Sequence, residues 1–396
     1  MGEIVYILGT EINNVIEDWD GLSPPLSKNF FNVALKKREF SDEYFEETVK
    51  DVYDYIEKNW NITKEDLAVS SFNYEKCLTL LEYQSQQALQ EENENDYKNL
   101  MNILLKLKKF FASVFYYFEH FAFASKTMRN LGKVIFYEKP TIITFNSDCI
   151  LEYILESIWG KNINTPHEYF TFENEEIPDD LLAYSRNDWN KRLGYGFKFD
   201  EIQLQQAGVN TFVKGSRFYA IKNIELYSNP ILKLCGSINW FRYLPIKSSH
   251  IFPGEVEPKL GEKESEILLK NGTWWYGKRP EHNGWLLDPI MITPSLYKEK
   301  YHDVKPFKEI WEIAKKKITH SEKLVIIGHS FQPSDLITKQ LFSEVNFDSR
   351  LKELIIINPD HDQVEVMKKL CQFEGNIIWY SNLDEYLQTF EGIISS

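Results

Sequence analysis

The chain has 396 residues, of which 43% are apolar, so it can bury a core large enough for one large α/β domain with insertions or for two domains. Its net charge of −14 repels phosphate backbones, and we expect no nucleic-acid binding by this chain alone. The four cysteines form no CxxC pair, which excludes a zinc ribbon, and we expect no metal. No apolar run reaches the roughly 18 residues of a membrane helix, so we expect a cytoplasmic protein with free thiols.

The first part of the chain predicts one strand followed by a long helical segment. Ile4–Leu8 is apolar, β-branched and ends at a glycine, as buried parallel strands do. Two prolines in 21–25 predict a loop. Residues 41–130 have a helical pattern, and from Leu100 to Phe121 apolar residues recur three and four apart. We therefore expect 41–130 to be a helical insertion after the first strand, with its aromatic stripe in the core.

The rest of the chain alternates predicted strands with predicted helices. The strands are Thr141–Phe145, Pro230–Leu234, Asp288–Pro294, Lys323–Ile327, Glu353–Ile357 and Asn376–Tyr380. The helices begin at Ile150 and cover 307–318, 335–342 and 364–370. Two stretches, 160–228 and 240–290, predict irregular insertions. Such alternation is typical of a Rossmann-like, doubly wound parallel sheet, and we expect residues 1–396 to form one such α/β domain.

Polar residues follow the predicted strands, where parallel sheets bind ligands. Gly9 offers a tight turn to a phosphate, but Glu11 stands where the second glycine of a GxGxxG fingerprint would be. In Thr144-Phe-Asn146-Ser-Asp148, an amide and a carboxylate follow a strand directly. An Asn side chain both donates and accepts, so Asn146 could hold a ribose hydroxyl and orient a water. The alternative is that Asn146 or Asp148 simply caps the next helix.

Two later strands end in similar groups. Gly328-His329-Ser330 follows one strand and Asn358 follows the next, so these residues are expected to line the same edge of the sheet. Such groups commonly hold the phosphate and ribose hydroxyls of a nucleotide. A single histidine at a strand end is more often structural than catalytic, which is the alternative for His329.

The order of these motifs resembles sirtuin-like domains, particularly the bacterial NAD-cleaving domains of anti-phage defence systems. The resemblance covers both ends of the chain and leaves out the helical and middle segments. The matching segments are Leu8-Gly9-Thr10-Glu11, Ser23-Pro24-Pro25-Leu26, Thr144-Phe-Asn146-Ser-Asp148, Lys233-Leu-Cys235-Gly-Ser237 with Trp240, Ile292-Thr-Pro294, Ile327-Gly-His-Ser330 and Ile357-Asn358-Pro359.

The resemblance implies a role for each matching position. Gly9, Thr10 and Asn13 would face the NAD phosphates. Thr144 would also contact NAD, Asn146 would be the catalytic residue that positions the nicotinamide ribose and the attacking water, and Asp148 would support the nicotinamide side. The adenosine half of NAD would contact Gly328, Ser330 and Asn358.

Two departures from the family pattern bear on activity. Glu11 puts a carboxylate near the phosphate position, so either it faces outward or NAD binds more weakly. Cys235 stands where the family has its catalytic histidine. A thiol, with an ordinary pKa of about 8.5, is a weak hydrogen-bond partner, and loss of a positioned acid–base group typically costs roughly 10²–10⁴ in rate.

The chain is therefore expected to be an NAD glycohydrolase effector of a bacterial anti-phage complex, releasing nicotinamide and ADP-ribose. The alternatives are an NAD- or ADP-ribose-binding subunit impaired by Cys235, and a structural assembly protein with a vestigial pocket. By resemblance, the partner would be a second copy, a HerA-class ATPase or an Argonaute-like protein. The two CxxC pairs of deacylating sirtuins are missing, which disfavours lysine deacylation.

Overall fold

A parallel sheet of six strands is the centre of the fold. The computed structural model describes residues 3–159, 195, 201–202, 230–245, 266–269, 279–281, 284–292, 306–329, 339, 341–342, 350–371, 373 and 375–395. The strands of this sheet are β1 (Ile4–Leu8), β2 (Thr141–Thr144), β4 (Ile231–Lys233), β9 (Lys323–Ile327), β10 (Glu353–Ile357) and β11 (Asn376–Tyr380). They lie in the order β11-β10-β9-β1-β2-β4.

Counted along the chain, this order is 3-2-1-4-5-6, the order of a doubly wound Rossmann sheet, with its switch point between β1 and β9. The α/β class predicted from the alternating pattern is thus present. The central strands are buried from their second residue onward, Val5 to Leu8 in β1 and Leu324 to Ile327 in β9, because both faces of the sheet are covered.

The register brings the carboxyl ends of the strands to one edge. Leu8 pairs with Thr144 on one side and with Ile327 on the other. Thr144 in turn pairs with Lys233, and Ile327 pairs with Ile357. The residues that directly follow these strands therefore lie along the same edge, which is where the candidate residues were expected.

The chain between β1 and β2 is helical. Its helices are η1 (Thr10–Val15), α1 (Phe30–Leu35), α2 (Arg38–Ser41), α3 (Glu43–Trp60), α4 (Lys64–Val69), α5 (Tyr74–Gln90), α6 (Glu94–Ala122) and α7 (Lys126–Glu138). Short polar side chains begin the longer ones: Asp42 accepts from the Phe45 amide at α3, and Ser125 from the Met128 amide at α7. Helical structure thus extends beyond the predicted 41–130 at both ends.

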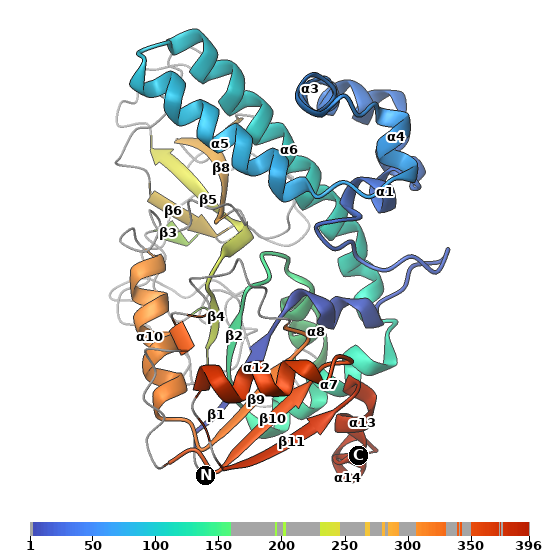
Figure 1. Ribbon diagram of the computed structural model, residues 1–396, viewed down its shortest axis with the longest axis vertical. Helices are drawn as coiled ribbons and strands as arrows, with labels where there is room; N and C mark the ends of the chain where they lie inside the picture. Colours follow the sequence, from blue (N-terminus) through green and yellow to red (C-terminus); the bar gives the residue numbers. More distant parts are fainter. Residues whose placement is uncertain are drawn as a thin grey trace, which may run out of the picture.

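Helices α5 and α6 pack against each other and extend away from the parallel sheet (Figure 1). The predicted apolar stripe of α6 is buried, as Leu104, Leu107, Phe111 and Phe118 illustrate. These side chains pack in the core, as expected from the sequence.

A second sheet has the order β3-β6-β5-β8-β7. Its strands are β3 (Glu201–Ile202), β5 (Gly236–Pro245), β6 (Glu266–Leu269), β7 (Arg279–Glu281) and β8 (Gly284–Met291). Where irregular structure was expected over 240–290, the described residues therefore include paired strands. The strand predicted at 288–294 corresponds to β8, which pairs antiparallel with β5 and β7 in this sheet.

The remaining described helices surround the parallel sheet. They are α8 (Ile150–Trp159), α10 (Phe307–Thr319), α12 (Asp362–Cys371), α13 (Leu383–Gln388) and α14 (Glu391–Ile394). Helix α10 contacts β4, α13 contacts β11, and α7 packs on α8 (Figure 1). The helix predicted at 335–342 lies largely outside the described residues. Within the described parts of the chain, no helix combines the length and apolarity needed to cross a membrane.

Candidate functional site

The turns after β1 and β9 are packed directly against each other. Gly9 donates its amide to Ile327 O (2.9 Å), and the Glu11 amide donates to Gly328 O (3.3 Å). A Cβ on Gly9 would collide with the Gly328 carbonyl, and Gly328 itself has a left-handed φ of +60°. Close backbone packing therefore explains both glycines without a ligand. Of the turn residues, Thr10 is the exposed one.

The turn after β2 brings two predicted residues together with Asn13. Asn13 Nδ2 donates to Asp148 Oδ2 (2.9 Å), and Asn146 Nδ2 donates to Gly9 O (3.3 Å). Thr144 Oγ1 accepts from the Asn146 amide (3.1 Å) and so fixes the start of this turn. Asp148 Oδ1 accepts from the Ile150 amide at the start of α8 (3.1 Å), so the capping alternative applies to Asp148. The Asn146 side chain points to the β1 turn instead.

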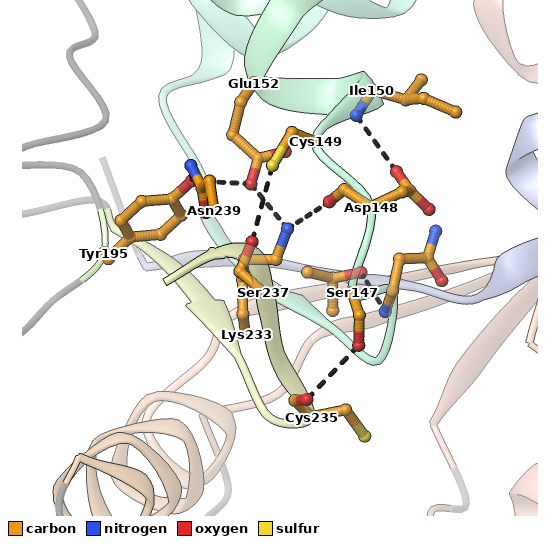
Figure 2. Close-up of polar contacts among 12 residues, drawn as sticks. Ser147, Asp148, Cys149, Ile150, Glu152, Tyr195, Lys233, Cys235, Ser237 and Asn239 are labelled. Atoms are coloured by element: carbon orange, nitrogen blue, oxygen red, sulfur yellow. Dashed lines mark hydrogen bonds and ion pairs between the residues drawn. The ribbon is translucent and has the colours of Figure 1, made fainter. Parts of the chain in front are cut away.

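Behind this turn lies a buried cation. Lys233 Nζ donates to the Asp148 carbonyl oxygen and to Glu152 Oε1, the latter at 2.6 Å (Figure 2). Glu152 also accepts from the Tyr195 hydroxyl (2.9 Å), which accepts from Asn239 Nδ2 (3.1 Å). Lys233 and Glu152 are 1% and 3% exposed, so their charges compensate each other away from water.

The electrostatics of this cluster follow from burial and pairing. Burial raises the pKa of Asp148, and nearby Glu152 raises it further, while Lys233 acts in the opposite direction. For Lys233, burial favours the neutral amine, but Glu152, Cys149 and Asp148 outweigh this effect and the pKa is raised. Lys233 therefore stays cationic at neutral pH.

A cavity of about 10 Å³ lies between the strand ends and the helices. Its lining consists of Leu8, Ile12, Asn13, Met128, Thr144, Asn146, Asp148, Leu151, Glu152 and Lys233. The side-chain oxygens Asn13 Oδ1 and Asn146 Oδ1 are buried and have no hydrogen-bond partner among the described residues. Because ligand pockets usually measure roughly 300–1,000 Å³, this cavity can hold only a small part of any nucleotide.

Glu11 and Asn358 contact each other on the other side of the switch point. Asn358 Nδ2 lies 3.4 Å from both Glu11 Oε2 and His329 O, and its Oδ1 accepts from the Asp360 amide (2.9 Å). Glu11 is half-buried, and burial followed by the charge of Asp360 raises its pKa. The carboxylate thus turns toward Asn358, the residue assigned to the adenosine ribose.

The Cys235 side chain is turned away from this cluster. Figure 2 shows its sulfur directed away from Asp148 and Lys233, and the residue is not part of the cavity lining. Its carbonyl oxygen accepts from Ser147 Oγ (3.3 Å) and from the Ile292 amide (2.8 Å). What Cys235 contributes here is its backbone, which ties the β4 end to the Asn146–Asp148 turn.

The structure thus brings together Asn13, Thr144, Asn146 and Asp148, and separately Glu11, Gly328 and Asn358. Ser330 lies outside the described residues. From the sequence we predicted no role for Lys233 or Glu152. The feature that could have revealed them is a lysine in an otherwise apolar strand, because a buried charge is tolerated there only when it is paired. In the described ranges, no group of three or more His, Cys, Asp or Glu is placed to hold a metal ion.

Compared with models of protein families, the chain matches none, and no curated protein sequence matches it either.

Proposed function

We propose that the chain binds NAD across the carboxyl ends of β1, β2, β9 and β10 and hydrolyses it to nicotinamide and ADP-ribose. The strand order supports this, since doubly wound sheets bind dinucleotides at the switch point. The observation that carries the proposal is the state of the Asn146 side chain. The residue is 7% exposed, its Nδ2 donates to Gly9 O, and its Oδ1 has no partner among the described residues and can accept a hydrogen bond.

In this hydrolysis a water oxygen bonds to C1′ of the nicotinamide ribose as the C1′–nitrogen bond breaks. The bonding electron pair neutralises the nicotinamide ring, and a proton leaves to solvent. Asn146 Oδ1 would accept from a ribose hydroxyl or from the attacking water. Asp148 and Asn13 would hold the turn that carries Asn146, through the bonds that join η1, β2 and α8.

A second candidate is a subunit that binds NAD or ADP-ribose without cleaving it. Two observations favour it: the Cys235 sulfur points away from the cluster, and Glu11 turns toward Asn358. The first means that the Cys235 side chain does not take the role of the family's histidine, and the second places a carboxylate where the adenosine half would bind.

The wider setting follows the resemblance to sirtuin-like defence domains. In this proposal the helical segment over 41–130 is an insertion into a Rossmann-like domain. The protein acts in the cytoplasm as an anti-phage effector, as a homo-oligomer or with a HerA-class ATPase or an Argonaute-like protein. Because the net charge of −14 repels phosphate backbones, the partner would make any contact with nucleic acid.

The test is NAD consumption by the purified chain, alone and with the product of the neighbouring gene. Asn146→Ala should lower turnover by roughly 10²-fold or more if Asn146 positions the reacting groups. Asn14→Ala is the matched control, because Asn14 is an exposed asparagine in η1, the helix that follows β1. Circular dichroism and a thermal melt on each variant separate loss of activity from loss of fold.

The outcomes distinguish the candidates. Turnover that Asn146→Ala removes and Asn14→Ala retains supports hydrolysis. NAD binding by calorimetry with no turnover under any condition supports the second candidate. Absence of both binding and turnover contradicts both and favours a structural assembly role. If wild type turns over NAD, Cys235→His tests whether position 235 can take the role of the family's histidine: a raised rate supports a sirtuin-type mechanism, and an unchanged rate argues against it.

A further inference from the structure

Three buried polar groups face the same small cavity behind the Asn146 turn. Asn13, Asn146 and Lys233 all line it, and they are 3%, 7% and 1% exposed. They come from η1, the β2 turn and β4, so the cavity lies where three separate elements meet. Buried polar groups at such places are normally satisfied by protein or by ordered water.

The orientation of both amides is determined by their partners. Asn13 Nδ2 points to a carboxylate oxygen of Asp148, and Asn146 Nδ2 points to the carbonyl oxygen of Gly9. The Gly9 carbonyl oxygen can only accept, and Asp148 accepts from the Ile150 amide through Oδ1 and from Asn13 through Oδ2, so each amide presents its NH₂ group to its partner. The two oxygens that remain are acceptors, and both are buried without a partner in the described part of the chain.

Lys233 supplies the complementary donor. An ammonium group has three N–H donors, and the described residues provide Lys233 with two acceptors, Asp148 O and Glu152 Oε1. A third donor is therefore available beside the cavity that Lys233 lines. The positive charge also makes the cavity unsuitable for a metal cation, although two carbonyl oxygens alone would attract one.

We infer that this cavity is a binding site for one water molecule, which donates to Asn13 Oδ1 and Asn146 Oδ1 and accepts from Lys233 Nζ. The volume of about 10 Å³ matches a single water, and buried waters typically make about three hydrogen bonds. The site depends on burial and hydrogen bonding alone, so it exists whether or not the protein cleaves NAD.

The water gives Lys233 a role beyond pairing with Glu152. Through it, the ammonium group is linked to the Asn146 side chain, which it does not bond directly. Lys233 thereby becomes a positioning residue for Asn146: it fixes the Asp148 end of the turn directly and the Asn146 amide through the water. A ligand that needs Asn146 Oδ1 must share this water or displace it.

The test is a crystal structure of the full chain at a resolution that shows ordered waters, for wild type, Asn13→Leu and Asn239→Leu. Wild type should show one peak within about 2.7–3.2 Å of Asn13 Oδ1, Asn146 Oδ1 and Lys233 Nζ. In Asn13→Leu, a side chain of similar size carries no acceptor and the peak should be lost. Asn239→Leu is the matched control, because Asn239 Oδ1 is also buried without a partner among the described residues, but Asn239 does not line the cavity.

A wild-type map without this peak overturns the inference, and so does a peak that persists unchanged in Asn13→Leu. Retention of the peak in Asn239→Leu, together with its loss in Asn13→Leu, supports it. The wild-type map alone is decisive if Asn13→Leu does not fold. NAD turnover has no part in this readout, so its result is independent of the proposed hydrolysis.

Discussion

At the scale of single residues, Gly9 and Gly328 hold the two central turns of the sheet together. The Gly9 amide bonds to the end of β9, and the Gly328 carbonyl accepts from Glu11. Ile12 N lies only 2.7 Å from where a Cβ on Gly328 would be. Neither position has room for a side chain, so both glycines are structural requirements before any ligand is considered.

Gly9→Ala should therefore destabilise the fold. The added methyl group collides with backbone, which cannot move aside as a side chain can, so we expect a loss of about 1–3 kcal/mol or more in the free energy of unfolding. Urea unfolding of wild type and variant measures it. Gly392→Ala is the control: nothing lies within 4 Å of its added Cβ and it is in helix α14, so it should be neutral or slightly stabilising. Equal stability of Gly9→Ala and wild type would contradict the close packing.

At the scale of elements, an aromatic cluster joins the helices between β1 and β2. Phe110 of α6 is fully buried. Its ring lies 5.2 to 6.3 Å, centroid to centroid, from rings on α1, α2 and α3, those of Phe30, Phe31, Phe40, Phe45 and Tyr53. Such edge and tilted pairs add to the free energy of burial. Phe110 thus joins α6 to the three helices α1, α2 and α3, which lie about 50 or more residues earlier in the chain.

Phe110→Ala should cost roughly 3–5 kcal/mol in the free energy of unfolding, because it removes a large buried ring and leaves a cavity. Leu89→Ala, on helix α5 at a residue that is 59% exposed, should change it by no more than about 0.5 kcal/mol. Both values come from chemical unfolding with the m-value checked for constancy. A small effect of Phe110→Ala would mean that the helices α1, α2 and α3 do not depend on α6.

At the scale of the whole molecule, burial holds several ionisable groups in one protonation state. Burial raises the pKa of Tyr74 and of Tyr195 well above the ordinary value. The pKa of Lys233 is also raised, but here burial lowers it, and Glu152, Cys149 and Asp148 outweigh the effect of burial. The stabilisation by its charge is fully present below the unfolded pKa of about 10.4 and is lost as pH rises through the folded pKa.

The protein should therefore lose stability in alkali. Above pH 10 or so the unfolded chain releases tyrosine protons that the native state retains, so each buried tyrosine lowers the free energy of unfolding by up to about 1.4 kcal/mol per pH unit. Tyr74→Phe removes one such group and should make this decline shallower. Urea titrations of wild type and Tyr74→Phe at several alkaline pH values test this, and identical slopes for the two proteins would contradict the prediction.

The sequence by itself determined the parallel sheet and the place of the candidate site. Apolar β-branched runs such as Ile4–Leu8 and Glu353–Ile357 can be satisfied only when both faces are covered, and that local property is written in the sequence. Since parallel strands end at one edge, the polar residues after them, Asn146 and Asn358 included, had to gather there. The period of α6 likewise predicted a buried helix.

Only the tertiary structure decided what each polar side chain does. The second sheet depends on pairing between distant segments that have no clear period, such as β5 with β8. Which elements meet decides three features of the site. Asn13 and Asn146 turn toward the cavity, the Cys235 sulfur turns away from the cluster, and Lys233 pairs with Glu152. Hydrogen bonding and charge compensation act over a few ångströms in space, and spacing along the chain does not specify those distances.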